Sequence, residues 1–188
     1  MRRFFFACKN KRSAPSKKPS VLNLFAYTGG ATAVAAKAGA SVCHVDAAKG
    51  MVQAAKENLR ISGLEDAPVR YIVDDCKKFV EREIRRGHKY DGIIMDPPSY
   101  GRGPGGEVWK LEECAFELIS LAAKVLSDDP LFFLVNSYTT GLSPATMGYM
   151  VMTALGGRGR IETGEIGLRV SASGLYLPAG AATRWTAK

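Results

Sequence analysis

Long apolar runs and metal-binding spacings are what this 188-residue sequence lacks. No apolar stretch approaches the roughly 20 residues that cross a bilayer, and the basic start of the chain has only a short apolar stub, so we expect neither a membrane span nor export. The two histidines and four cysteines include no Cys-x-x-Cys pair, which leaves no ligand spacing for zinc and no disulfide framework. These absences predict a cytoplasmic protein without a metal site.

Acidic residues are also missing from the first 20 positions, which hold seven of the 26 positive charges. From residue 21 onward the chain carries 19 positive and 18 acidic side chains, so the net charge of +8 belongs mostly to the N-terminus. A segment rich in Ser, Pro and Lys cannot bury enough apolar surface to offset its ordering entropy. We therefore predict a disordered basic tail over 1–19 and one folded domain over 20–188. The tail is either a solvated extension or an arm that contacts phosphates.

Short apolar runs alternate with segments of helical periodicity from residue 20 onward. The runs expected to be strands, buried on both faces of a parallel sheet, are 21–25, 42–45, 69–73, 92–95 and 131–135. A later helix is expected to begin at Ser143-Pro144 and to reach about Leu155. Two final runs, 160–170 and 175–185, flank a Ser/Gly turn and predict a hairpin. The sequence therefore predicts an α/β fold with a mostly parallel sheet, helices on both faces and a C-terminal antiparallel hairpin.

Ligands of such sheets bind at the carboxyl ends of the strands, where this sequence places glycines and aspartates. The turn 25–30 leads into a helix whose free N–H groups suit an anion, but it lacks the glycine patterns that accommodate a pyrophosphate. Asp46 ends the second strand, where a carboxylate accepts ribose hydroxyls. Asp75 ends the third strand, where its carboxylate could accept from an exocyclic amine and the N–H of Cys76 could bind a ring nitrogen. A nucleoside with a carboxylate and no phosphate matches these groups, and S-adenosylmethionine has that shape.

Each of these groups also has a simpler interpretation. A Gly-Gly turn can serve only to reverse the chain, and an aspartate after a strand can cap the next helix. The order and spacing of the groups favour the binding site.

The fourth predicted strand ends in the turn 95–100, Met-Asp-Pro-Pro-Ser-Tyr. Its two prolines lack N–H donors and hold a rigid extended turn, so carbonyls and the Asp96 carboxylate can point together into a cleft. Such acceptors can hold an amine, and Tyr100 can stack on a base. The simpler alternative is a proline turn that caps the strand. The glycine-rich stretch 101–106 that follows is predicted to be a mobile lid or substrate loop.

These motifs resemble those of class I S-adenosylmethionine-dependent methyltransferases, and within them the bacterial group that acts on 23S ribosomal RNA. The segments that carry the resemblance are 21–30, 45–51, 54–58, 96–103 and 106–110. The resemblance runs from about residue 20 to the end and implies a Rossmann-like sheet of seven strands whose last strand is antiparallel. It also implies S-adenosyl-L-methionine as cofactor, S-adenosyl-L-homocysteine as product and RNA, most naturally ribosomal, as partner.

The resemblance assigns residues to the site as well. The positions that it implies for the cofactor are Phe25, Tyr27, Gly29 and Gly30 at the methionine part, Asp46 and Ala47 at the ribose and adenine, and Asp75 and Cys76 at the adenine. The positions that it implies beside the transferring methyl are Asp96, Pro97 and Pro98. We expect Asp96 to touch the cofactor and to orient the acceptor, and Tyr100 to orient the acceptor ring.

The family extends further at its N-terminus, so we expect a truncated chain. Members that methylate a cytosine carbon have a cysteine after the fourth or fifth strand, where this sequence has 96–98 and 136–138. We therefore predict transfer to a nucleobase nitrogen by direct in-line displacement. Carbon-5 methylation of cytosine, a protein or small-molecule acceptor, an inactive cofactor-binding domain and a nicotinamide oxidoreductase stay open as alternatives. The oligomeric state is open as well.

Overall fold

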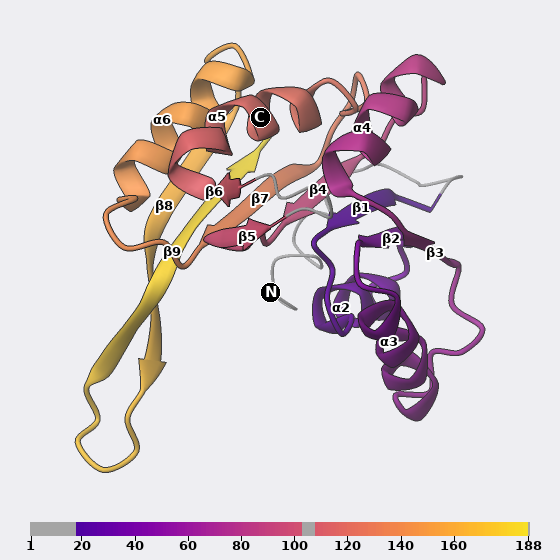
Figure 1. Ribbon diagram of the computed structural model, residues 1–188, viewed down its shortest axis with the longest axis horizontal. Helices are drawn as coiled ribbons and strands as arrows, with labels where there is room; N and C mark the ends of the chain where they lie inside the picture. The colour runs from indigo at the N-terminus through magenta and orange to yellow at the C-terminus, as the bar shows by residue number, and fades with distance from the viewer. Residues whose placement is uncertain (1–17, 103–107, 188) are drawn as a thin grey trace.

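One mixed sheet organises the chain (Figure 1), in a computed structural model that describes residues 18–102 and 108–187. Its seven strands follow the order β3-β2-β1-β4-β7-β9-β8. Their bounds are β1 Ser20–Leu24, β2 Ser41–Asp46, β3 Val69–Val73, β4 Gly92–Met95, β7 Phe132–Ser137, β8 Arg160–Arg169 and β9 Tyr176–Thr186. The first five are parallel to one another, whereas β9 is antiparallel to both β7 and β8. The predicted α/β fold with a C-terminal antiparallel hairpin is confirmed.

Helices lie on both faces of this sheet, as predicted. Their bounds are α2 Gly30–Lys37, α3 Lys49–Ile61, α4 Cys76–Arg85, α5 Leu111–Ala123 and α6 Pro144–Ala154. Figure 1 shows α2 and α3 on one face and α4, α5 and α6 on the other. The start of α6 matches its prediction, because Pro144 occupies the first turn and the Ser143 hydroxyl accepts the Thr146 N–H at 3.2 Å.

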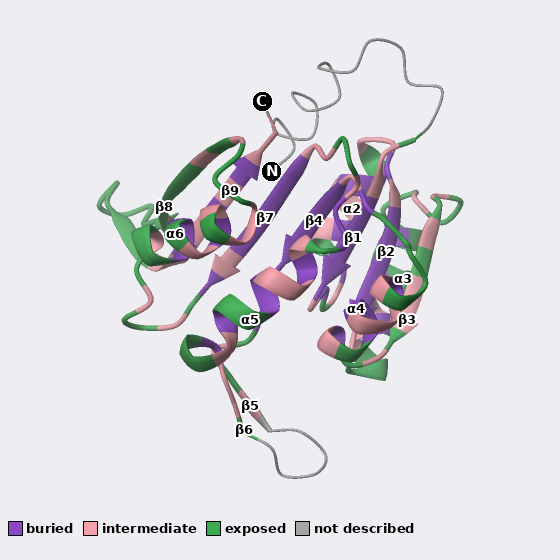
Figure 2. Ribbon diagram, turned by 90° about the horizontal axis from the view of Figure 1, so that it is seen from above, coloured by how far each residue is buried: buried purple, intermediate pink, exposed green. Residues whose placement is uncertain are grey.

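Two apolar clusters fill the space between the sheet and its helices. The larger cluster includes Phe79, Leu118 and Met147 from α4, α5 and α6, and the smaller includes Ala35 and Ala36 from α2. Successive side chains of a strand alternate between the two faces, and the central strands are therefore buried almost throughout (Figure 2). Because these strands are buried on both faces, their sequences are nearly continuous apolar runs, and these runs predicted them as strands.

The carboxyl ends of the five parallel strands meet at one edge of the sheet. The register sets Leu24 of β1 beside Val45 of β2 on one side and Met95 of β4 on the other. Met95 in turn lies beside Val135 of β7. Residues that follow these strands are therefore neighbours in space although they are far apart in sequence, and they form the candidate site.

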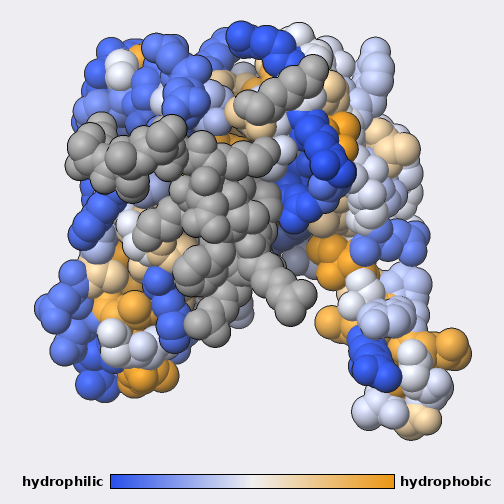
Figure 3. Space-filling view, turned by 180° about the vertical axis from the view of Figure 1, so that it is seen from behind, coloured by the Kyte–Doolittle hydropathy of each residue, from blue (hydrophilic) through white to orange (hydrophobic). Residues whose placement is uncertain are grey.

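The C-terminal hairpin extends beyond the body of the molecule. Its base packs under α6, but its far end is exposed, with exposed fractions of 59% for Leu168, 70% for Leu175 and 58% for Leu177. Figure 3 shows this end projecting from the body with apolar side chains on it. The pairing of β8 with β9 shifts by a residue between Ile166 and Gly167. The sequence predicts the hairpin and its turn but not its projection, because helical periodicity does not show how far α6 covers the strands.

A second, two-stranded sheet corrects one prediction. The expected loop over 101–106 begins as strand β5 (Tyr100–Arg102), which pairs antiparallel with β6 (Val108–Lys110). The rest of that loop, and residues 1–17 of the predicted tail, lie outside the described residues. In the part of the chain that the structure describes, no helix has the length and apolar character that a membrane crossing needs.

Candidate functional site

The turn between β1 and α2 is strained. Phe25 and Tyr27 have φ values of 54° and 48°, in the left-handed region that residues other than glycine rarely adopt. Such conformations cost on the order of 1–3 kcal/mol each and persist only where the surroundings impose them. The Tyr27 ring is 63% exposed at the carboxyl edge of the sheet. The turn is therefore a fixed and open structure, more specialised than a simple chain reversal requires.

Helix α3 packs directly against this turn. Asn58 donates its side-chain amide to the Thr28 carbonyl at 2.9 Å, a contact that the sequence analysis did not predict. Gly29 has φ 85°, and a Cβ built on it would lie 2.9 Å from the Cβ of Ala55, so glycine is required there for packing. A Cβ on Gly30 would meet no atom within 4 Å. Gly30 opens α2, whose first N–H groups have no partner within the helix, and the open space beside it suits the predicted carboxylate.

Asp46 links the turn to the loop after β2. Its carboxylate accepts the Tyr27 N–H and the Ala48 N–H, each at 2.9 Å. The second contact closes a turn before α3, whose N-cap is Ala48, so Asp46 is not itself the cap of that helix. A carboxylate has about four acceptor positions, so these two contacts leave capacity for two ribose hydroxyls. The neighbouring Ala47 is exposed at the same edge.

Asp75 and Cys76 begin α4 and have different surroundings. The exposed Asp75 caps the helix, because its carboxylate accepts the Lys78 N–H at 2.9 Å. The Cys76 thiol is buried, accepts the Phe25 N–H at 3.2 Å and donates to the Val45 carbonyl at 3.8 Å. Burial raises its pKa to about 12. The side chain of Cys76 thus supports the first turn, and a contact with adenine would have to use its backbone N–H.

A buried chain of hydrogen bonds supports α2 from beneath. Asn23 of β1 donates to the Thr32 hydroxyl at 2.9 Å, and that hydroxyl pairs with Nδ1 of His44 in β2 at 2.9 Å. All three side chains are buried. Burial lowers the pKa of His44 to about 4, so its ring is neutral at neutral pH. This network fixes the start of α2 relative to the two strands that lead to the site.

The turn after β4 adds a carboxylate to the same edge. The Asp96 N–H donates to the Leu24 carbonyl at 3.4 Å, which sets Asp96 beside the end of β1. Burial raises the pKa of Asp96, while side-chain hydrogen bonds from Tyr138 and Asn136 act in the opposite direction. Asn136 lies in β7, the other neighbour of β4, and Tyr138 follows that strand. Asp96 is therefore an exposed carboxylate at the edge of the sheet, near Asn136 and Tyr138.

The sequence analysis did not propose Asn136 and Tyr138 as site residues. Since Met95 lies opposite Val135, the same register brings Asp96 opposite Asn136. The sequence signal that could have indicated them is the presence of polar residues at the end of a buried strand. That signal did not say which strand would be the neighbour of β4.

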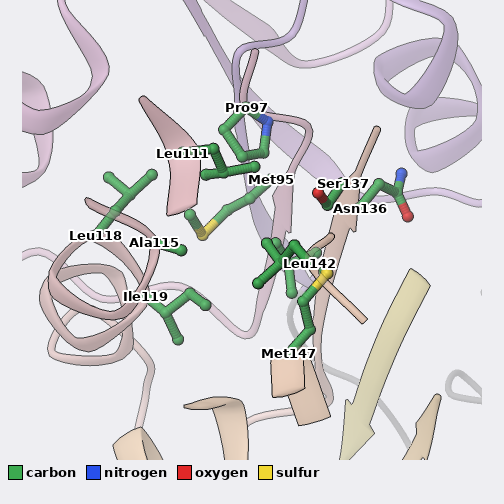
Figure 4. A pocket seen from close by; sticks show the side chains of 11 residues that line it. Met95, Pro97, Leu111, Ala115, Leu118, Ile119, Asn136, Ser137, Leu142 and Met147 are labelled. Atoms are coloured by element: carbon green, nitrogen blue, oxygen red, sulfur yellow. The ribbon is translucent and has the colours of Figure 1, made fainter. Parts of the chain in front are cut away.

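The two prolines serve the turn itself. Pro97 is buried and lines a small apolar cavity between β4, β7, α5 and α6 (Figure 4). The Pro98 carbonyl accepts the indole N–H of Trp109 at 2.7 Å, and the Ser99 carbonyl accepts the Leu111 N–H at 3.0 Å. These two carbonyls bind β6 and the start of α5, whereas the sequence analysis expected carbonyls aimed into a cleft. The acceptor function expected of the turn therefore rests mainly on the Asp96 carboxylate.

Exposed aromatic rings surround this edge. Tyr27, Tyr100 and Tyr138 follow the neighbouring strands β1, β4 and β7, and their exposed fractions are 63%, 54% and 50%. Trp109 of β6 packs near Phe25, with ring centroids 6.2 Å apart, and so connects the β5–β6 ribbon to the first turn. Exposed rings offer flat surfaces on which a planar base can stack.

Comparisons with known proteins point in one direction. The sequence pattern of a family described as S-adenosylmethionine-dependent methyltransferase matches residues 9–110. The chain is 35% identical over 124 residues to the ribosomal RNA large subunit methyltransferase K/L of Shewanella frigidimarina, covering 65% of this chain and 17% of that protein. It is 41% identical over 85 residues to the ribosomal RNA large subunit methyltransferase I of Shewanella denitrificans, covering 45% of this chain and 21% of that protein.

A solved structure extends the similarity to the whole domain. The crystal structure of the SAM-dependent methyltransferase from Agrobacterium tumefaciens superposes with a TM-score of 0.87 at 38% identity, over 98% of this chain and 61% of that one. The chain thus spans about a fifth of the length of the two curated relatives and somewhat over half of the solved chain.

Proposed function

This chain belongs to the S-adenosylmethionine-dependent methyltransferase family, and we propose that it transfers a methyl group to a nucleobase nitrogen of ribosomal RNA. Membership of the family was predicted from the motifs and is confirmed. The observation that carries the proposal is the position of the Asp96 carboxylate, which follows β4 beside the end of β1, at the edge of the sheet where the other predicted site residues lie. The printed names of the relatives support RNA as the acceptor.

The residues at the strand ends suit the cofactor in the order that the sequence predicts. The start of α2 would receive the methionine carboxylate, Asp46 and Ala47 the ribose and adenine, and Asp75 with the Cys76 N–H the adenine. When bound, the cofactor supplies a methyl group on a positively charged sulfur. The chain has to align an acceptor nitrogen in line with that methyl at about 3 to 3.5 Å. In this proposal Asp96 accepts a hydrogen bond from the acceptor N–H, and Tyr100 stacks on its ring.

Nitrogen is favoured over carbon because of where the cysteines lie. Carbon-5 of a pyrimidine becomes nucleophilic only after a thiolate adds to the ring. Burial raises the pKa of Cys43 to about 11 and that of Cys76 to about 12, and Cys114 lies on α5, the helix that follows the β5–β6 ribbon. Cys8 lies outside the described residues.

A variant in which all four cysteines are changed to serine or alanine tests this choice. We expect turnover to stay within several-fold of wild type once circular dichroism confirms folding, because nitrogen attacks the methyl directly. Cys76→Ser is the sensitive position, since its side chain supports the Phe25 N–H. A single folded cysteine variant without activity, or a covalent adduct with RNA that contains 5-fluorocytosine, would assign the reaction to carbon.

Calorimetry separates the remaining classes of function. S-adenosylhomocysteine and NADH are titrated in parallel into the chain. Binding of S-adenosylhomocysteine alone supports methyl transfer, binding of NADH would support an oxidoreductase, and binding of neither would support an inactive domain. Protein and small-molecule acceptors are then tested against ribosomal RNA in a transfer assay.

The two interpretations of the basic tail predict different salt dependences of RNA affinity. Deleting residues 1–19 removes all seven of its positive charges, and if these contact phosphates the slope of log affinity against log salt flattens by up to about five units. Cofactor affinity should not change. A chain of full length with the seven positive residues changed to glutamine is the matched control, because it keeps the length and removes only the charge. Equal salt slopes in all three proteins would make the tail a solvated extension.

A further inference from the structure

We propose that the outer edge of β8 binds a second copy of this chain, with the two β8 strands antiparallel about a two-fold axis at Gly167. β8 is the last strand in the order of the sheet, so among the described residues no strand pairs with its outer edge. Such an edge presents a row of free N–H and C=O groups to another strand. Natural edge strands often prevent this pairing with lysine, proline or a bulge, and β8 contains neither lysine nor proline.

The bulge of the hairpin lies in β9 and leaves β8 regular. Ile166 pairs with Gly180 and Gly167 pairs with Pro178, so the extra residue at this step is Ala179 of β9. A bulge bends the strand that carries the extra residue. The outer strand of the hairpin therefore keeps the regular alternation that a further strand needs for pairing.

The direction of the backbone groups shows which residues of β8 can pair outward. The Val170 N–H donates to the Leu175 carbonyl at 2.8 Å, so Val170 is hydrogen-bonded to the other arm of the hairpin. Residues along an antiparallel strand alternate between those bonded to the neighbouring strand and those that are not. By this alternation the N–H and C=O groups of Glu165, Gly167 and Arg169 point away from β9. A second copy would have to pair with these three residues.

The charges on this edge favour one register. Pairing of two copies centred on Glu165 or on Arg169 would place like charges opposite each other, which destabilises a sheet. Pairing centred on Ile166 or on Leu168 would place both charges opposite uncharged residues. Pairing centred on Gly167 places Glu165 of each copy opposite Arg169 of the other, and opposite charges across a strand pair are stabilising. Both side chains are exposed, and among the described residues neither forms an ion pair within its own chain.

The apolar side chains of the hairpin agree with the same register. Leu168 pairs with Leu177 on one face of the hairpin, and both are exposed (Figure 3). Centring on Gly167 places Leu168 of each copy opposite Ile166 of the other, on that same face. A hairpin of two strands is only marginally stable in water, and three or more strands with an apolar face are needed for independent stability. The second copy supplies the missing strands to the projecting part of the hairpin.

The projection of the hairpin leaves room for this contact (Figure 1). β8 runs from the body of the molecule toward the tip, from Arg160 to Arg169. In an antiparallel pair the body of each copy therefore lies beyond the tip of the other, and the two bodies stay apart. Because the contact is the same surface on both copies, it closes on itself and gives a dimer without further growth.

Sedimentation velocity of the full chain, over concentrations up to several hundred micromolar, tests the proposal. We expect wild type to form a dimer whose population rises with concentration. Glu165→Arg and Arg169→Glu each create two pairs of like charge in the dimer, so each should weaken dimerisation by about tenfold or more. The matched control is Glu65→Arg, an exposed position on the loop before β3 at the opposite edge of the sheet, and it should dimerise like wild type.

Restoring the opposite charges tests the register itself. The double variant Glu165→Arg/Arg169→Glu again pairs opposite charges and should dimerise like wild type. An equimolar mixture of the two single variants should form a mixed dimer, because every contact in it joins an arginine to a glutamate. A wild type that is monomeric at every concentration, or that forms larger open oligomers, would overturn the proposal. Dimerisation that the single variants do not weaken, or that neither the double variant nor the mixture restores, would overturn it as well.

Discussion

Replacing Asp96 with alanine is expected to lower the turnover of methyl transfer by roughly 100-fold or more, while affinity for S-adenosylhomocysteine changes far less. Asp96 stands at the end of β4 beside β1, and its proposed partner is the acceptor N–H. Misplacement of a reacting group by about 1 Å can reduce a rate by this factor. A change confined to kcat shows that an interaction of the transition state has been lost.

The pH profile sharpens this expectation. Asp96 is expected to bind the acceptor N–H in its ionised form, and burial raises its pKa. The rate should therefore fall as the pH drops through a value above that of an ordinary aspartate, and Asp96→Asn should remove this acid limb. The control is Asp128→Ala, an exposed carboxylate on the loop before β7 at the opposite edge of the sheet. Full turnover in folded Asp96→Ala would exclude Asp96 from acceptor alignment.

Replacing Asp46 with alanine should weaken binding of S-adenosylhomocysteine by at least about tenfold. Hydrogen bonds to a charged group contribute about 1.5–3 kcal/mol each, and about 1.4 kcal/mol corresponds to a factor of ten in affinity. The substitution is expected to remove the ribose contacts and also the carboxylate that accepts the N–H of the strained residue Tyr27. Isothermal titration calorimetry measures the affinity directly.

The fold should survive this change, because Asp46 lies at the end of β2 and is not part of either apolar cluster. Asp66→Ala, an exposed carboxylate on the loop between α3 and β3, is the matched control and should bind like wild type. Unchanged affinity in folded Asp46→Ala would exclude Asp46 from the cofactor site and leave it only its contacts with the Tyr27 and Ala48 N–H groups.

Most of the fold could be predicted from the sequence because its signals are local. The strands over 69–73 and 92–95 have the predicted bounds, since apolar runs of parallel strands end where the chain leaves the sheet. The helix after Ser143-Pro144 begins where its cap predicts. The β5–β6 ribbon was missed because residues 100–102 and 108–110 pair across a glycine-rich stretch that has the composition of a loop.

The site was predictable only in part, because several of its contacts join residues that are far apart in the sequence. Residues that follow strands of a parallel sheet share one edge, so the aspartates could be grouped from the sequence. The contacts of Tyr138 and Asn136 with Asp96 depend on β7 lying next to β4, and that of Cys76 with Phe25 depends on which way the first turn of α4 faces. No local pattern encodes either arrangement.

One measurement tests the proposed function most directly. Large-subunit ribosomal RNA transcribed without modifications is incubated with the chain and methyl-labelled S-adenosylmethionine, digested to nucleosides and analysed by mass spectrometry. The account predicts a label on the nitrogen of one nucleoside, retained in the variant without cysteines and lost in Asp96→Ala. A label in 5-methylcytidine, or no label in any nucleoside, would contradict it.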